Sequence, residues 1–172
     1  MGEPEMCAWW FACNDHPSDK ATYDIKVRVP KGRQAISNGV LQSRTSRHGW
    51  TSWHWRMSYP MASYLAFFAA GRFTIERSRT ASGLPVLNAV SRALYPSERR
   101  ASLRLLRNTG ADVEWLASQL GPYPFRTTGG LVTSLWVGFA LENQSRPTYP
   151  YLGNDGYARS ILVHELAHQW FG

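Results

Sequence analysis

Two histidines near the end of the chain, His164 and His168, stand four positions apart in the sequence H-E-L-A-H. On an α-helix this spacing places both imidazoles on one face, one turn apart, where they can bind the same metal ion. The apolar residues of this segment fall on the opposite face and can pack against a core; they are Leu162, Leu166 and Ala167. The pattern therefore requires a helix that is buried on one side and open on the other.

This helix is expected to begin near residues 154–156, with Asp155 as its N-cap. Glu165 directly follows the first histidine, where its carboxylate can accept a proton from a water molecule that the metal activates. Imidazole ligands together with a carboxylate are common in catalytic zinc sites, so zinc is the expected metal. The alternative is a helix with two ordinary hydrogen-bonded histidines and a solvated glutamate.

The first part of the chain alternates apolar and polar residues, a pattern typical of half-buried strands. The alternation is strict over residues 22–29, and shorter runs follow at 34–36 and 52–57. Residues 37–39, S-N-G, predict a tight turn. Residues 1–57 are therefore expected to form antiparallel β-structure.

The middle of the chain gives weaker signals. The apolar run 61–70 suggests a short buried helix, and residues 72–77 suggest a further strand. The small polar segment 80–83 predicts a domain boundary.

Beyond that boundary, one long helix is expected from Pro96 to Leu120, ended by Gly121 and Pro122. Apolar or small residues recur along it at spacings of three and four: Leu103, Leu106, Gly110, Val113, Ala117 and Leu120. Strands followed by helices predict an α+β fold.

The charge of the chain argues against a nucleic-acid partner. Lys and Arg number 19 against 12 Asp and Glu, a net charge of +7, but only Arg99 and Arg100 are adjacent. No basic stretch is present that could bind a row of phosphates. The longest apolar run, 61–70, is too short to cross a bilayer, so no membrane segment is expected. The start of the chain also lacks the features of a signal peptide, which favours the cytoplasm but leaves the compartment unknown.

The two cysteines, Cys7 and Cys13, lie six positions apart. In an extended strand this separates their Cα atoms by about 20 Å, so they cannot form a disulfide unless the chain turns between them. Neither belongs to a C-x-x-C pair. Both are therefore interpreted as buried thiols rather than as a zinc or redox site.

Four segments carry motifs in a characteristic order: residues 11–21 (F-A-C-N-D-H-P-S-D-K-A), 121–125 (G-P-Y-P-F), 139–143 (F-A-L-E-N) and 164–172 (H-E-L-A-H-Q-W-F-G). Together they resemble the aminopeptidase N family of gluzincin metallopeptidases, which also includes leukotriene hydrolase. The third motif differs from the family's G-A-M-E-N by Phe for Gly and Leu for Met. The resemblance covers the whole chain.

The resemblance implies roles for individual residues. His164 and His168 would bind one zinc ion, and Glu165 would be the general base. Glu142 would bind the free α-amino group of the substrate, assisted by Glu3.

Ala140 and Leu141 would lie on an edge strand that pairs with the substrate backbone. The expected partners are peptides with a free N-terminus.

The resemblance also implies how the chain is organised. Residues 1–83 would be the C-terminal part of an antiparallel β-domain, and residues 84–172 the opening part of a thermolysin-like α/β zinc-peptidase domain. The family's third zinc ligand, a Glu about eighteen residues after the second histidine, would lie beyond Gly172, as would its catalytic Tyr. We therefore expect a fragment that lacks the C-terminal portion of the catalytic domain and binds zinc weakly by itself.

The expected function is that of a zinc-dependent aminopeptidase. Two alternatives remain open from the sequence. One is an epoxide hydrolase of the leukotriene hydrolase kind, and the other is a zinc- or peptide-binding fragment without catalytic activity.

Overall fold

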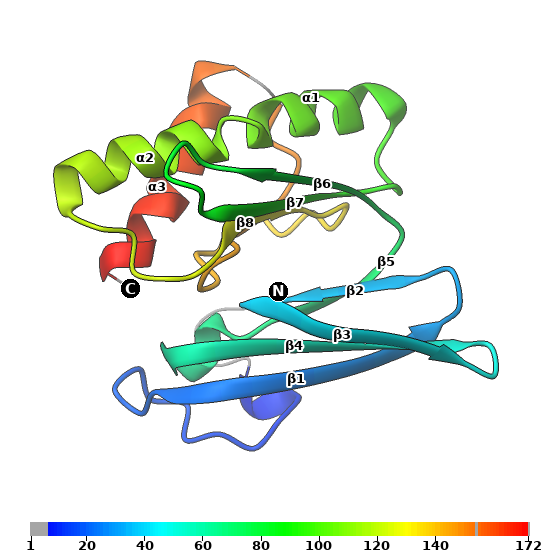
Figure 1. The fold of residues 1–172 in the computed structure, drawn as a ribbon. Helices are drawn as coiled ribbons and strands as arrows, with labels where there is room; N and C mark the ends of the chain where they lie inside the picture. The colour runs from blue at the N-terminus through cyan, green and yellow to red at the C-terminus, as the bar shows by residue number, and fades with distance from the viewer. Residues whose placement is uncertain (1–6, 154, 172) are drawn as a thin grey trace. The chain divides into compact units, whose positions relative to one another are not determined.

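The alternating segments at the start of the chain form strands, as their pattern predicts. The computed structural model describes residues 7–153 and 155–171. The element order, strands first and helices later, confirms the α+β fold class (Figure 1). By their internal contacts the elements divide into two compact units, Met1–Arg72 and Phe73–Gly172.

The first unit is built from antiparallel strands. Three of them form one sheet in the order β1-β4-β3, with bounds β1 (Ala21–Pro30), β3 (Val40–Arg47) and β4 (Trp50–Met61). A separate antiparallel pair consists of β2 (Gln34–Ser37) and β5 (Phe68–Gly71). Two short 3₁₀ helices complete the unit, η1 (Cys7–Trp9) and η2 (Ser63–Leu65). The predicted antiparallel β-structure is confirmed, although β3 went unnoticed in the sequence because its residues are almost all exposed.

Strand β4 shows why the alternating pattern specifies this sheet. Its buried positions include Trp53 and Trp55. They alternate with positions that are exposed or half-buried, namely Ser52, His54 and Arg56. The indole Nε1 of Trp55 donates a hydrogen bond to the carbonyl of Ala35 at 3.0 Å, which links β4 to β2. Gly39 has a φ of +71°, and a Cβ atom there would lie 2.0 Å from the carbonyl oxygen of Arg56. The predicted turn at 37–39 therefore needs glycine both for its φ and for space.

The short helix predicted over residues 61–70 is wrong. Strand β4 continues to Met61, η2 follows, and β5 begins at Phe68. The side chain of Asn38 explains the difference, since its Nδ2 donates to the carbonyl of Leu65 at 3.0 Å and its Oδ1 accepts from the N–H of Phe67 at 2.9 Å. A turn distant in sequence thus satisfies backbone groups that a helix would otherwise have paired.

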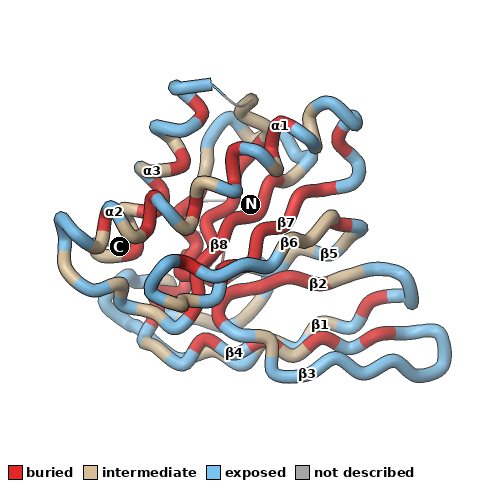
Figure 2. Tube along the Cα trace, turned by 45° about the horizontal axis from the view of Figure 1, so that its top comes forward, coloured by how far each residue is buried: buried red, intermediate tan, exposed pale blue. Residues whose placement is uncertain are grey.

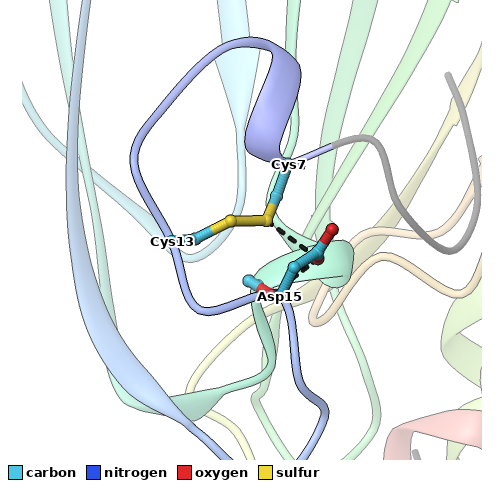
Figure 3. The surroundings of a disulfide bond; sticks show 4 residues. Cys7, Cys13 and Asp15 are labelled. Carbon is cyan, nitrogen blue, oxygen red and sulfur yellow. Dashed lines mark hydrogen bonds between the residues drawn. A yellow bond between two sulfur atoms is a disulfide. The ribbon is translucent and has the colours of Figure 1, made fainter.

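The interpretation of Cys7 and Cys13 as free thiols is also wrong, because the two form a disulfide (Figure 3). The chain turns between them through η1, where the N–H groups of Trp10 and Phe11 both donate to the carbonyl of Cys7. This turn brings the two Cα atoms to 6.6 Å, within bridging distance. Asp15 lies beside the bridge, its Oδ1 2.9 Å from Cys7 Sγ and accepting a hydrogen bond from Ser63 at 3.2 Å.

The second unit contains a mixed sheet in the order β6-β7-β8-β9. Its strands are β6 (Phe73–Arg79), β7 (Pro85–Ser91), β8 (Thr128–Val132) and β9 (Thr148–Tyr149). The β6–β7 pair is antiparallel, and the β7–β8 and β8–β9 pairs are parallel. Strands β7 and β8 are buried almost throughout (Figure 2). Burial on both faces removes the alternating pattern, which is why the sequence did not reveal these strands.

Three helices accompany this sheet: α1 (Pro96–Leu106), α2 (Thr109–Leu120) and α3 (Gly156–Phe171). Helix α1 contacts β7 and β8, and α2 contacts β8 and α3. Their apolar residues meet in one core with Val90, Val132 and Tyr149 from the strands.

The single long helix predicted from Pro96 to Leu120 is therefore two helices. The chain breaks at Asn108, whose side-chain Nδ2 donates to the carbonyl of Leu105 at 3.0 Å and so competes with the helical pattern. The break changes which residues face the core. Leu120 is exposed, for example, whereas Leu105 and Leu116 are buried.

Residues 80–83, which the sequence assigned to a domain boundary at Gly83, form the turn of the β6–β7 hairpin. The N–H of Gly83 donates to the carbonyl of Thr80 at 3.0 Å, and the N–H of Thr80 donates to that of Leu84 at 2.9 Å. The change between compact units lies earlier, between Arg72 and Phe73. Small polar residues favour either kind of segment, so composition alone did not separate them.

The disulfide leads to a prediction about stability. Cys13→Ser should destabilise the first unit by roughly 2 kcal/mol, the value expected for cross-linking so short a loop. Hydrogen exchange of the β1 and β4 amides measures this unit separately from the second. The double variant Cys7→Ser/Cys13→Ser should match the single one, because both remove the same bond. Equal protection in Cys13→Ser and the parent chain would contradict the prediction.

Candidate active site on helix α3

Helix α3 begins where the sequence predicts. The Oδ1 atom of Asp155 accepts a hydrogen bond from the N–H of Ala158 at 2.8 Å, which confirms Asp155 as the N-cap. Ala158, Leu162 and Leu166 are fully buried in the core of the second unit. Because these residues hold one face of the helix, the opposite face is oriented toward solvent.

The open face carries the two histidines. His164 is exposed and His168 is half-buried, and their Nε2 atoms lie 3.2 Å apart. Zn–N bonds of about 2.0–2.1 Å in a tetrahedral site place two nitrogen ligands about 3.3 Å apart. The pair therefore has the spacing that a single zinc ion requires of two of its ligands.

Glu165 differs from the histidines in its surroundings, because it is buried with 7% of its surface exposed. Across residues 7–153 and 155–171, no third Cys, His, Asp or Glu joins His164 and His168 in a group that could hold a metal. Glu165 is therefore not grouped with the two histidines in this structure, and its predicted role as general base stays a prediction.

Tyr149 on β9 lies next to this part of the helix. Its hydroxyl donates to the carbonyl of Leu162 at 3.4 Å. Burial, together with the negative charge of Glu165, holds the pKa of Tyr149 well above its ordinary value. Tyr149 therefore stays neutral and serves as a structural contact to α3.

The residues expected to bind substrate lie on the segment that leads into β9. Leu141 forms a bridge with Thr148, in which each N–H donates to the carbonyl of the other at 2.8 Å. The backbone of Leu141 is thus used inside the chain, which argues against the expected pairing of this residue with substrate. For Ala140, the residue before this bridge, backbone pairing with substrate stays a prediction.

Glu142 follows this bridge and is 9% exposed. Glu142, Glu165 and both histidines all belong to the second compact unit. Glu3, the other residue expected to contact the amine, lies outside the described residues.

The G-P-Y-P-F turn also contacts α3. The indole Nε1 of Trp170 donates to the carbonyl of Gly121 at 3.0 Å, and the ring of Tyr123 packs edge-on against Trp170 with centroids 5.3 Å apart. Three motifs far apart in sequence, at 121–125, 139–143 and 164–172, thus belong to one folded unit.

Sequence reasoning did not single out two buried residues of this region, Arg146 and Gln169. Arg146 is 1% exposed, and burial lowers its pKa to about 10. Gln169 is 5% exposed and directly follows the second histidine. Gln169 lies inside the motif at 164–172 and Arg146 lies three residues after the motif at 139–143, and these positions were signals that could have drawn attention to both.

Several known proteins are similar to this chain. Residues 2–65 match the family model of the peptidase M1 N-terminal domain. The glutamyl aminopeptidase of Rattus norvegicus is 28% identical over 183 residues, covering 99% of this chain and 19% of the rat protein. The leucyl aminopeptidase of Saccharolobus solfataricus is 26% identical, covering 95% of this chain and 22% of its own length.

Among solved structures, a mutant M1 zinc metallopeptidase of Deinococcus radiodurans superposes with a TM-score of 0.85 at 25% identity, covering 99% of this chain and 39% of that one. The same enzyme crystallised with a Tyr-Ser-Ala substrate gives a TM-score of 0.84 at 26% identity.

These findings point to one class of protein: the chain is similar over nearly its full length to aminopeptidases and to M1 zinc metallopeptidases. The resemblance to the aminopeptidase N family is thereby confirmed. The chain spans about a fifth of the length of the curated relatives. Within the described residues, no helix is long and apolar enough to cross a membrane.

The histidine pair leads to a prediction about metal binding. His164→Ala and His168→Ala should each lower the Zn²⁺ affinity of the chain by about a hundredfold, since four-ligand sites gain about 3 kcal/mol per ligand. Isothermal titration of Zn²⁺ measures this change. His54→Ala is the matched control, because His54 pairs with Asp24 at 2.6 Å in the first unit. This variant should have the same Zn²⁺ affinity as the parent chain. Undiminished affinity in both α3 variants would exclude the pair as the site.

Proposed function

We propose that this chain forms part of the active site of a zinc-dependent aminopeptidase. The observation that carries the proposal is the distance of 3.2 Å between the Nε2 atoms of His164 and His168 on α3. The buried residue Glu165 stands between them in the sequence. The relatives described above are aminopeptidases and M1 zinc metallopeptidases, which supports the same reaction class.

His164 and His168 would hold the zinc ion as two of its protein ligands. When bound, zinc supplies Lewis-acid chemistry that lowers the pKa of water and polarises a carbonyl. Glu165 would accept the proton of the attacking water and later deliver it to the leaving amine. Its burial, with 7% of its surface exposed, would hold the carboxylate in one place beside the water that it deprotonates.

Glu142 would select peptides with a free N-terminus. An ammonium group that enters a desolvated cleft needs an anionic partner, and a carboxylate is the strongest available. Glu3 would provide a second carboxylate for the same amine. Ala140 would offer backbone groups to the extended substrate, as an edge strand does.

The epoxide hydrolase alternative has no observation in its favour, since the relatives described above carry peptidase names. A zinc- or peptide-binding role without turnover is distinguished from catalysis by assay. The appropriate protein is one in which this chain is continued through a complete catalytic domain. Hydrolysis of amino-acyl anilides with free but not with acetylated amines would support the proposal.

In that protein, Glu165→Gln should retain zinc but lose several orders of magnitude in kcat, because the amide cannot accept a proton from water. Metal content and steady-state kinetics on the same preparation measure both properties. Near-normal turnover with zinc bound would remove Glu165 from the role of base.

Glu142→Gln should raise KM for free-amine anilides about tenfold or more, since a neutral amide replaces a charge-assisted contact to the ammonium. The loss of charge is the only intended change, because the two side chains have the same shape. If the variant processed these substrates as well as the parent, Glu142 would not be the amine-binding residue.

A further inference from the structure

Gln169 is a buried amide on α3 that no role in the proposed reaction uses. It stands one residue after His168, on the side of the helix that faces the 142–145 segment rather than the open face. Burial of an amide is unfavourable unless its donors and acceptor are paired, so its hydrogen bonds show what the position requires.

Both ends of this amide bind backbone. The Oε1 atom accepts a hydrogen bond from the N–H of Ser145 at 2.6 Å, and Nε2 donates to the carbonyl of Glu142 at 3.1 Å. Nε2 also lies 3.4 Å from the carbonyl of Glu165, one helical turn earlier. A single side chain thus joins the residue proposed to bind the amine to the turn of helix that carries the proposed base.

The segment that Gln169 holds is a tight turn. The N–H of Arg146 donates to the carbonyl of Asn143 at 2.9 Å, and Ser145 has a φ of +68°, which is unfavourable for a residue with a side chain. Such a backbone conformation persists only where its surroundings stabilise it. Gln169 binds the N–H of this same residue, so its amide helps to determine the path of the turn.

We propose that Gln169 is the positioning residue that sets the place of Glu142 relative to the zinc-binding face of α3. The inference rests on the proposed role of Glu142 and adds a contact that fixes its backbone, because Gln169 Nε2 donates to the Glu142 carbonyl from the same helix that carries the two histidines. Cleavage of the first peptide bond requires the amine site and the metal to be separated by one residue of substrate. A displacement of about 1 Å at a reacting or binding group costs on the order of a hundredfold in rate.

The test compares two metal-directed ligands in the protein with a complete catalytic domain. Leucine hydroxamate carries both a zinc-binding group and a free amine, whereas acetohydroxamate carries only the zinc-binding group. Calorimetric binding of both ligands separates amine recognition from metal binding without reference to turnover. Gln169→Met keeps the length of the side chain but loses every hydrogen bond of the amide.

We expect Gln169→Met to lower the affinity for leucine hydroxamate at least about tenfold. The affinity for acetohydroxamate should change less than about twofold. Trp170→Phe is the matched control, because it removes a hydrogen bond from the adjacent position of α3 to Gly121 and leaves residues 142–145 untouched. Its ratio of the two affinities should equal that of the parent.

An equal loss of affinity for both hydroxamates in Gln169→Met would overturn the inference, since it would show that Gln169 merely supports the helix. Unchanged binding of both ligands would overturn it as well. If Gln169→Met fails to fold, Gln169→Glu provides the same comparison, because it retains an acceptor for Ser145 but cannot donate to Glu142. A parent protein that binds zinc but does not distinguish the two hydroxamates would instead refute the role of Glu142, and the inference with it.

Discussion

The site depends on one physical constraint, the burial of one face of α3 in the core of the second unit. Ala158, Leu162 and Leu166 are spaced by four residues and are fully buried, so the rotation of the helix about its axis is determined. That rotation places His164 and His168 on the opposite side with their Nε2 atoms 3.2 Å apart. A rotation of the helix would expose apolar surface, so the burial of these residues also fixes the direction of the two imidazoles.

Polar contacts from the end of the same helix organise the segments around it. Trp170 binds the carbonyl of Gly121, and Gln169 binds the backbone on both sides of the 142–145 turn. The parallel pairing of β9 with β8 brings this turn to the edge of the mixed sheet, beside the helix. The residues that follow the second histidine therefore connect the two other motifs of this unit to the helix that carries His164 and His168.

The sequence predicted those parts of the fold in which local pattern and final environment agree. Strand β1 alternates because one of its faces packs and the other meets solvent, and the start of α3 follows from the capping side chain of Asp155. Prediction failed where distant groups satisfied the backbone. Asn38 pairs with residues 65 and 67, so the apolar run there needs no helix, and the turn through η1 brings Cys7 within reach of Cys13.

The sequence by itself determined that His164 and His168 share one face of a helix, because the H-E-L-A-H spacing equals about one helical turn. It also determined the relationship to M1 peptidases, through motifs whose order and spacing are specific. Only the tertiary structure decided that Leu141 uses its backbone within the chain, that Glu165 is buried while His164 is exposed, and that Gln169 holds Glu142. These properties depend on hydrogen bonds between residues far apart in the chain, and no local pattern of residue types records such pairings.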